Sequence, residues 1–433
     1  MKKKILLSLD AWYPQVAGPN IVVTNYYRHL NENGNDCRIV VPSYGKKKDA
    51  AANALTKFEP LRCKGMHLPI GEGGGFCDAL PSQDKKLKRF VKEFQPDILH
   101  SHSPFNLGKF YAEVGKKISA PSIFTFHTKF RDEFLRLTKS KVLTRYMMKR
   151  IMKAINLHDF VWTVSNGSAE TLREYGYKGE ITVVRNGTDM TVPENPEELV
   201  DWVNREYGLT DCENVMLFVG RIVAVKNLEL VFRALQKVKE RSKLPFKMVV
   251  VGNGLQLNDY KKQAEELGIS DRVIFTGEIT DRTKLKGFYL RANLFVFASE
   301  FDTASLCPLE AAAFSLPTLL VRDCPTSETI RDGVSGFCEV NDSDAWAEKI
   351  IEIFSDRNKL EEVGANARKF VYRSWQDVVN EVENKYDEIL SRTGGGRLNS
   401  LFIRALFSRK SRSERRSSSR RVCNDGFHGR RAL

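Results

Sequence analysis

Short apolar runs alternate with segments of helical periodicity along most of the chain. Runs of strand length and composition fall in the first half at 4–9, 38–41, 97–100, 122–126, 160–164 and 181–184. Helical periodicity falls between them at 21–30, 85–94, 107–118, roughly 138–156 and after Ser165. Repeated strand–helix units predict a parallel sheet with helices on both faces.

The alternation restarts after a polar, proline-bearing stretch. Strand-like runs then fall at 215–219, 247–251, 273–276, 294–298 and 318–321, and helical segments at 228–241, 256–267, 282–290, 309–314, 345–355, 358–371 and 375–390. We therefore predict an α/β protein of two doubly wound Rossmann-like domains facing a shared cleft. The predicted parts are a first domain at 1–195, a linker with a short helix at 196–212, a second domain at 213–374, a helix at 375–393 that packs back toward the first domain, and a tail at 394–433.

A length of 433 residues, with 42% hydrophobic and 28% charged residues, suits a globular protein with two cores of ordinary size. Every apolar run is shorter than the roughly 18 residues of a membrane-spanning helix. The apolar stretch after the N-terminal lysines is also too short for a signal peptide, so we expect a cytoplasmic protein. The eight cysteines include no CxxC pair, which favours reduced thiols over disulfides or zinc.

The net charge of +14 is concentrated at the C-terminal end. Residues 397–433 hold 11 basic and 2 acidic residues. Their apolar helical face is predicted either to lie at an anionic membrane surface or to belong to a disordered tail. The face consists of Leu398, Leu401, Phe402, Ala405 and Leu406. Aromatic residues are not interleaved with the basic ones, so nucleic-acid binding is not expected.

A second basic region lies on the helix predicted near 138–156. Lys141, Arg145, Lys149 and Lys153 recur every four residues and form a basic stripe. An apolar side is supplied by Leu143, Met147, Ile151 and Ala154. The stripe is either a solvated face or a membrane and acceptor surface, and both interpretations stay open.

The densest set of candidate functional residues follows the run at 294–298. A loop with Asp302 and Ser305 comes first, and Pro308 then suits the first turn of a helix that carries Glu310. Amides at a helix start attract phosphate, and carboxylates accept hydrogen bonds from hydroxyl groups, so the stretch fits a sugar nucleotide. An ordinary loop acid and helix acid would give the same pattern.

Two cations follow another strand in the same way. Arg221 and Lys226 precede a helix, where they could hold a diphosphate. The planar guanidinium of Arg binds phosphate through two N–H groups, and the ammonium of Lys binds it as a compact charge. Surface cations at a loop are the alternative. Because parallel strands end at one edge of their sheet, we expect these residues around one cleft with Gly18, His127 and Gly252, which also follow strands.

A set of short motifs then occurs in chain order. They are Pro14-Gln-Val-Ala-Gly18, Phe126-His127-Thr128, Val164-Ser165, Arg185-Asn-Gly-Thr-Asp189, the GR-x(4)-K stretch at 220–226, Val251-Gly-Asn-Gly254, and the E-x7-E-like element that ends at Glu310. With these motifs, residues 4–390 resemble family 4 of the retaining, nucleotide-sugar-dependent glycosyltransferases, which have the GT-B architecture. The resemblance implies an acceptor-side first domain and a nucleotide-sugar-binding second domain.

The resemblance also implies roles for single residues. Arg221 and Lys226 would bind the donor diphosphate, and Glu310 the ribose. The implied donor-binding set is Gly18, Arg221, Lys226, Gly252, Asn253, Ser305, Leu306 and Glu310, and the implied catalytic set is His127 near the anomeric carbon, Asp302 on the sugar hydroxyls, and Glu310. Two positions depart from the pattern: Asp302 replaces the first Glu, and Asn253 stands where Asp is common. The shorter acid leaves the identity of the sugar open, and Glu300 lies two residues too far from Glu310 to replace it.

The implied reaction moves a hexose from a nucleotide-diphosphate sugar, such as UDP-glucose, with retention and without a protein-bound metal or other cofactor. The runs 100–108 and 125–128 are similar to the branch that glycosylates diacylglycerol. We therefore expect a lipid acceptor and a peripheral protein at the anionic inner face of the cell membrane.

Several alternatives stay open. One is a capsule or exopolysaccharide transferase with an undecaprenyl-linked acceptor, and others are a GT-B epimerase or a phosphorylase, which needs a pyridoxal-binding lysine that nothing here identifies. A non-catalytic, membrane-binding scaffold with the same fold would explain Asp302 and Asn253. A Rossmann dehydrogenase is disfavoured, because the first strand–helix turn lacks G-x-G-x-x-G.

Two further patterns favour structural roles. Asp342-Ser-Asp344 matches the DxD of metal-dependent glycosyltransferases, but it precedes a helix and is predicted to cap it. His100-x-His102 places two imidazoles close together, but no third metal ligand is evident, so a structural or acceptor-side role is expected.

Overall fold

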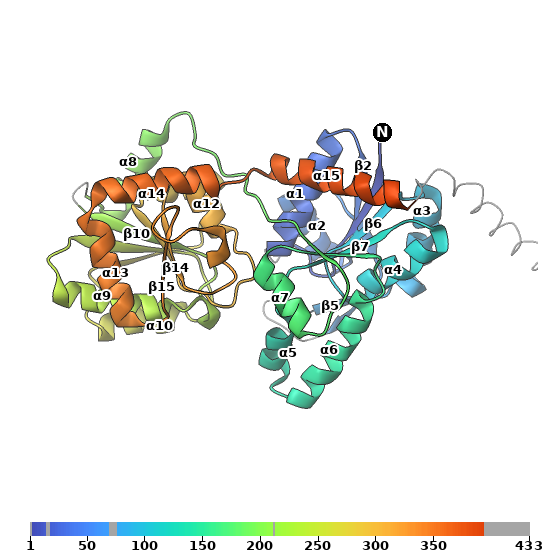
Figure 1. Cartoon of the computed structure of the whole chain (residues 1–433), viewed down its shortest axis with the longest axis horizontal. Helices are drawn as coiled ribbons and strands as arrows, with labels where there is room; N and C mark the ends of the chain where they lie inside the picture. Colours follow the sequence, from blue (N-terminus) through green and yellow to red (C-terminus); the bar gives the residue numbers. More distant parts are fainter. Residues whose placement is uncertain (1, 14–17, 69–75, 211–212, 394–433) are drawn as a thin grey trace, which may run out of the picture.

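The computed structural model describes residues 2–13, 18–68, 76–210 and 213–393. They form two α/β lobes that lie side by side, the first on the right of Figure 1 and the second on the left. Each lobe is built on one parallel sheet, so the predicted pair of doubly wound domains is confirmed. The predicted tail helix and most of the 14–18 motif lie outside the described residues.

The first lobe contains a seven-stranded sheet in the order β3-β2-β1-β6-β7-β8-β9. Its strands are β1 (Lys4–Ser8), β2 (Asp36–Pro42), β3 (Leu61–Cys63), β6 (Ile98–Ser101), β7 (Ser122–Phe126), β8 (Phe160–Thr163) and β9 (Ile181–Val183), with a separate antiparallel hairpin of β4 (Gly65–Leu68) and β5 (Phe76–Ala79). Its helices are α1 (Gly18–Glu32), α2 (Lys46–Thr56), α3 (Lys85–Phe94), α4 (Asn106–Ile118), α5 (Phe130–Thr138), α6 (Lys141–Ile155) and α7 (Asn166–Glu174). Strand β7 is buried at every position, as a parallel strand covered on both faces must be.

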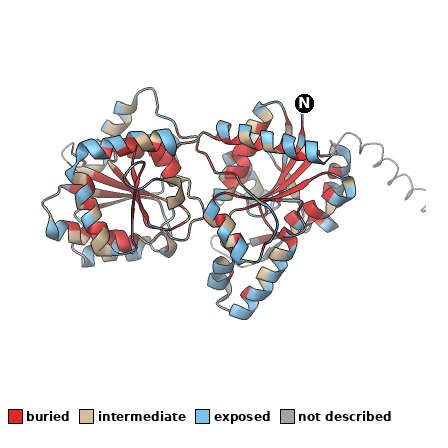
Figure 2. Ribbon diagram, viewed as in Figure 1, coloured by how far each residue is buried: buried red, intermediate tan, exposed pale blue. Residues whose placement is uncertain are grey.

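The second lobe contains a six-stranded sheet in the order β12-β11-β10-β13-β14-β15. Its strands are β10 (Asn214–Val219), β11 (Phe246–Val251), β12 (Val273–Gly277), β13 (Leu294–Phe297), β14 (Thr318–Val321) and β15 (Phe337–Glu339). Its helices are α8 (Pro196–Tyr207), α9 (Leu228–Arg241), α10 (Leu257–Glu266), α11 (Arg282–Arg291), α12 (Cys307–Ala313), α13 (Ser343–Ser355) and α14 (Arg357–Phe370). In both lobes buried strands lie beneath helices whose outer faces are exposed (Figure 2).

The last described helix crosses from one lobe to the other. Helix α15 (Trp375–Arg392) follows the second lobe in the chain but lies along the first lobe, beside α1 (Figure 1). Its Trp375 and Tyr386 are buried in the core of the first lobe. Helix α8, at 196–207, packs on α11, and its Val203 belongs to the core of the second lobe.

The helix predicted near 138–156 differs from the observed structure. It begins at Lys141, and a second helix, α5, precedes it. The break falls at Lys139, which has a left-handed φ of 51°. The α5–α6 pair projects from the first lobe (Figure 1). The sequence pattern missed α5, in which Phe130 and Phe134 are buried whereas Leu135 and Leu137 are exposed.

The two patterns given structural roles are explained by local contacts. The Asp342 carboxylate accepts hydrogen bonds from the amides of Asp344 and Ala345, so the predicted cap of α13 is confirmed. His100 lies 2.7 Å from Tyr386 Oη through Nδ1 and 2.7 Å from Thr125 Oγ1 through Nε2. Throughout the described part of the chain, every helix is too short or too polar to cross a bilayer.

Candidate active site

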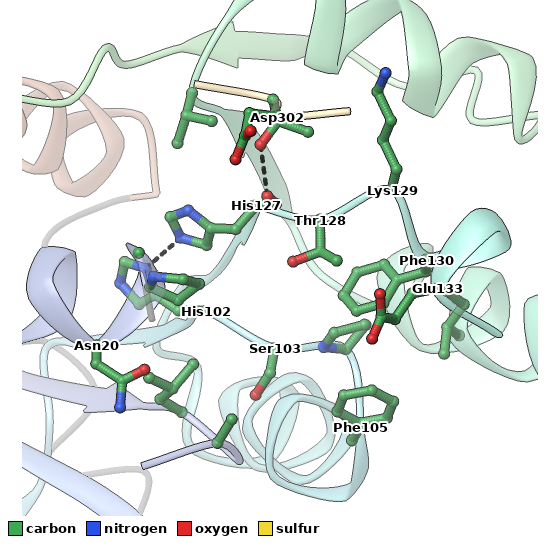
Figure 3. Close-up of a pocket in the computed structure, with 18 of the residues that line it drawn as sticks. Asn20, His102, Ser103, Phe105, His127, Thr128, Lys129, Phe130, Glu133 and Asp302 are labelled. Carbon is green, nitrogen blue, oxygen red and sulfur yellow. Dashed lines mark hydrogen bonds between the residues drawn. The ribbon is translucent and has the colours of Figure 1, made fainter. Parts of the chain in front are cut away.

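A cavity of about 1020 Å³ lies between the two lobes at the carboxyl ends of their strands. The first lobe supplies the residues that follow β1, β6 and β7, and the second lobe supplies those that follow β10 and β13. Seven of the predicted catalytic and donor-binding residues line it, namely Gly18, His127, Arg221, Lys226, Asp302, Ser305 and Leu306. The expected gathering of strand ends around one cleft is therefore observed for these residues. Figure 3 shows two of them, His127 from the first lobe and Asp302 from the second.

Lys226 and Asp302 form an ion pair within the cavity wall. The Lys226 ammonium lies 2.8 and 2.7 Å from the two carboxylate oxygens of Asp302 and 5.0 Å from the centre of the Phe297 ring. Both side chains are largely shielded from solvent, with exposed fractions of 12% and 24%, so the pair is screened less than a surface pair. Lys226, predicted to bind phosphate, and Asp302, predicted to bind sugar hydroxyls, therefore form one ion pair.

Glu300 takes no part in this ion pair. Its carboxylate accepts a hydrogen bond from Asn341 Nδ2 at 2.6 Å, and its backbone oxygen accepts one from Lys129 Nζ at 3.1 Å. Of the two acids near the start of the E-x7-E-like element, Asp302 is the one that lines the cavity.

Glu310 is buried beside the cavity and does not line it. Its carboxylate accepts a hydrogen bond from Tyr289 Oη at 2.8 Å and lies 3.3 Å from Arg282 Nη2, which also contacts Asp189 at 2.6 Å. Burial raises the pKa of Glu310, and the neighbouring Arg282 offsets part of that rise. Sequence patterns identified the acid but gave no sign of Tyr289 or Arg282, which follow a different strand.

Gly252 and Asn253 also lie outside the cavity lining and support the loop that carries Arg221. The amide of Ile222 donates to the backbone oxygen of Asn253 at 2.9 Å. Gly252 has a φ of 141°, and a Cβ placed on it would lie 1.9 Å from the backbone oxygen of Gly220. The two residues predicted to bind the donor are therefore placed to position a cation that does line the cavity.

Gly252→Ala is expected to lower kcat/KM about tenfold and to destabilise the fold by about 1–3 kcal/mol, because the new Cβ displaces the Gly220 loop. Gly268→Ala is the matched control, since Gly268 also has a positive φ, 63°, but nothing lies within 4 Å of its added Cβ. Steady-state kinetics and urea unfolding of both variants make the test. Equal effects in the two variants would show that backbone strain alone is responsible.

His127 contacts both lobes. Its Nε2 lies 2.9 Å from His102 Nδ1, and its backbone oxygen accepts a hydrogen bond from Thr303 Oγ1 at 2.7 Å (Figure 3). Burial lowers the pKa of His127 to about 3. The imidazole therefore stays neutral at physiological pH.

Further contacts hold the loop after β13 against the first lobe. Val164-Ser165 was one of the sequence motifs, but no pattern in the chain indicated that Ser165 contacts Thr303. Ser165 Oγ donates to the backbone oxygen of Thr303 at 2.7 Å. From the second lobe, the Glu328 carboxylate accepts from the amide of Asn166 at 2.9 Å and from that of Gly167 at the start of α7. These contacts hold Thr303, the neighbour of Asp302 in the chain, against the first lobe.

The other arm of the cavity extends under α5 and α6 and is largely apolar. Its lining includes Phe105, Phe130, Phe134, Leu137, Met147 and Ile151. Of the predicted basic stripe, Lys153 lines the cavity, whereas Lys141, Arg145 and Lys149 are exposed elsewhere on α6. Leu143, assigned to the apolar side of this helix, is 46% exposed, and neighbouring Val142 is 80% exposed. The tip of the α5–α6 pair therefore presents apolar and basic side chains together.

Comparison with known proteins finds matches along most of the chain. Residues 16–192 match the family model "Glycosyltransferase Family 4", and residues 203–370 match "Glycosyl transferases group 1". The chain is 28% identical over 406 residues to alpha-monoglucosyldiacylglycerol synthase of Streptococcus pneumoniae, covering 90% of this chain and 88% of that protein. It is 23% identical over 390 residues to GDP-mannose-dependent alpha-mannosyltransferase of Corynebacterium glutamicum, covering 90% and 89%. The fold is similar to that of Anabaena HepE in complex with UDP-glucose, with a TM-score of 0.68 and 16% identity over 90% of this chain and 100% of that one.

Proposed function

The chain belongs to the glycosyltransferases of GT-B fold whose family 4 and group 1 domains it carries in turn, and we propose that it moves a hexose from a nucleotide-diphosphate sugar to a membrane lipid such as diacylglycerol. One observation carries the proposal: a single cavity is lined by Arg221 and the Lys226–Asp302 pair and also by apolar side chains of α5 and α6. The name of the pneumococcal relative supports a diacylglycerol lipid, and the UDP-glucose bound by the Anabaena protein supports a UDP-sugar.

The donor is proposed to lie between the lobes. Arg221 and Lys226 hold its diphosphate, and because an ammonium group has three N–H donors, Lys226 can hold Asp302 and a phosphate oxygen at once. Asp302 accepts hydrogen bonds from sugar hydroxyls. Gly18 lines the cavity with nothing within 4 Å of the place where a Cβ would be, so a ligand can approach its backbone. Glu310 is proposed to bind the ribose, which would extend from the diphosphate toward the side of the cavity where Glu310 is buried.

In the proposed transfer, the bond between the anomeric carbon and the diphosphate oxygen breaks, and a bond to the acceptor oxygen forms on the same face. The acceptor proton passes to the leaving diphosphate. Arg221 and Lys226 stabilise the charge that the diphosphate gains. Neutral His127 lies near the anomeric carbon without opposing the positive charge that develops there. No step requires a protein-bound metal or another cofactor.

The apolar arm is proposed to hold the acyl part of the acceptor. The exposed basic and apolar side chains at the tip of α5–α6 suit the anionic surface of a bilayer, so the protein is proposed to be cytoplasmic and peripheral at the inner face of the cell membrane. A glycan acceptor is the second candidate, because charged side chains, among them Asp78, Lys109, Glu133 and Arg150, also line this arm.

The acceptor is tested by incubating the purified chain with UDP-glucose, UDP-galactose or GDP-mannose and vesicles of diacylglycerol with an anionic phospholipid. Mass spectrometry is expected to find a monohexosyl lipid, and NMR of the product an α-linkage. Products confined to the aqueous phase would overturn the lipid acceptor. Vesicle binding without turnover of any donor would favour a non-catalytic scaffold of the same fold.

Replacing Lys141, Arg145 and Lys149 with Gln is expected to weaken binding to anionic vesicles about a hundredfold, since each cation near such a surface contributes about 1 kcal/mol. Co-sedimentation at low ionic strength measures the loss. The control carries Gln at Lys85, Lys86 and Lys88, which are exposed on α3 of the same lobe. If both triple variants bind alike, α6 is not the contact surface.

A further inference from the structure

Three imidazoles are stacked at the floor of the cavity. The rings of His100 and His102 have centroids 4.3 Å apart with planes at 26°, and those of His102 and His127 lie 5.2 Å apart at 20°. His100 is anchored at both nitrogens by Tyr386 and Thr125. His102 and His127 line the cavity, so the stack ends where a ligand can reach it.

A single proton lies in the contact between His102 and His127. Burial lowers the pKa of both rings, so both are neutral at pH 7. Each neutral imidazole has one N–H and one lone pair. Across the 2.9 Å contact, either His102 Nδ1 donates to His127 Nε2, or the reverse holds. The two arrangements give His127 opposite tautomers.

The remaining nitrogen of His102 discriminates between them. His102 Nε2 is buried and has no hydrogen-bond partner among the described residues. If His127 were the donor, the proton of His102 would sit on this nitrogen as a buried N–H without an acceptor. If His102 is the donor, Nε2 carries only a lone pair, and orphaned buried N–H groups are rarer than under-used acceptors. The second arrangement is therefore favoured.

We propose that His102 is a positioning residue whose Nδ1–H fixes the orientation and tautomer of His127, so that His127 offers its Nδ1–H to the cleft as a hydrogen-bond donor. Its ligand is then an oxygen that accepts a hydrogen bond, such as a hydroxyl or ring oxygen of the hexose. Because the ring is neutral, it binds this oxygen without placing a charge beside the anomeric carbon. The identity of that oxygen rests on the proposed function, whereas the tautomer is a property of the protein alone.

The tautomer is tested by nitrogen-15 NMR of the full chain labelled at histidine, with His127→Gln to assign the signals. At pH 7 we expect a protonated Nδ1 and an unprotonated Nε2 for His127. His102→Phe keeps a ring but removes the donor, and is expected to give a mixture of His127 tautomers. In His102→Asn, the amide nitrogen is separated from Cα by the same number of bonds as Nδ1 of His102. Its N–H can therefore replace the lost donor, and this variant is expected to restore the wild-type signals.

Kinetics provide the second readout. His102→Phe is expected to lower kcat about thirtyfold with less than a threefold change in KM, and His102→Asn to stay within about threefold of the wild type, since the lost effect is that of orienting one donor. A wild-type His127 protonated at Nε2, or a His102→Phe tautomer like that of the wild type, would overturn the proposal. Should His102→Phe not fold, the wild-type spectrum still decides. Absence of transfer with the expected tautomer would count against the proposed function and not against this role of His102.

Discussion

Lys226→Ala is expected to lower kcat/KM for the nucleotide sugar about a thousandfold. The ammonium group is proposed to stabilise the leaving diphosphate, and it holds both oxygens of Asp302 at 2.8 and 2.7 Å. Alanine removes both interactions and leaves the Asp302 carboxylate in a largely shielded wall without its cation. Steady-state rates measure the loss, and circular dichroism with a melting curve shows whether the fold is intact.

Two further variants assign the cause of that loss. Lys284→Ala is the matched control. Lys284 is on α11, its ammonium lies over the ring of Trp202 on α8, and it does not line the cavity. Asp302→Asn breaks the ion pair but keeps the cation. If Lys226 acts only by holding Asp302, the double variant should be no slower than Lys226→Ala, and Asp302→Asn alone should be as slow. A Lys226→Ala rate within about threefold of the wild type would remove this residue from the mechanism.

Glu310→Gln is expected to lower kcat/KM about a hundredfold while leaving the protein at least as stable as the wild type at pH 7. The amide can still accept from Tyr289 Oη, but it loses the charge that strengthens hydrogen bonds to ribose hydroxyls, each worth about 1.5–3 kcal/mol. Stability behaves differently, because burial raises the pKa of the Glu310 carboxyl and so disfavours its charged form. Activity and stability are thus expected to change in opposite directions.

The pH dependence of that stability gives an independent check. A carboxyl whose pKa is raised on folding binds its proton more tightly in the folded state. Wild-type stability therefore falls as pH rises from the unfolded pKa through the folded one, and the Gln variant lacks this loss. Urea unfolding at pH 4 and pH 7 should show the variant gaining on the wild type at the higher pH. Glu361→Gln, an exposed acid on α14, should show no such gain, and a variant that loses stability at pH 7 would contradict this account.

Contacts between the lobes hold the loop that carries Asp302 against the first lobe. Thr303 is held by Ser165 and by the backbone of His127, and Glu328 caps the start of α7 across the lobe boundary. Each contact joins a loop at one sheet edge to a loop at the other. The neighbours of Asp302 in the chain are therefore fixed by the first lobe.

The sequence by itself determined the two parallel sheets and the sheet edge at which the candidate site residues gather. Strands covered on both faces must be apolar along their length, so β7, β10 and β13 were visible as short apolar runs. Polar and glycine residues directly after such runs must lie at the carboxyl edge. His127, Arg221 and Asp302 were found in this way, because the signal is local in the chain.

Only the tertiary structure decided which of these residues bond to one another. Lys226 and Asp302 are 76 residues apart, and Glu310 and Arg282 are 28 apart. His102 faces His127 because β6 and β7 are neighbours in the sheet, and Gly252 supports Arg221 because β10 and β11 are neighbours. No period of 2 or 3.6 residues encodes such pairs, since they depend on the order in which the strands of each sheet are arranged. The chemistry-bearing residue types are thus a property of the sequence, and their partners are a property of the fold.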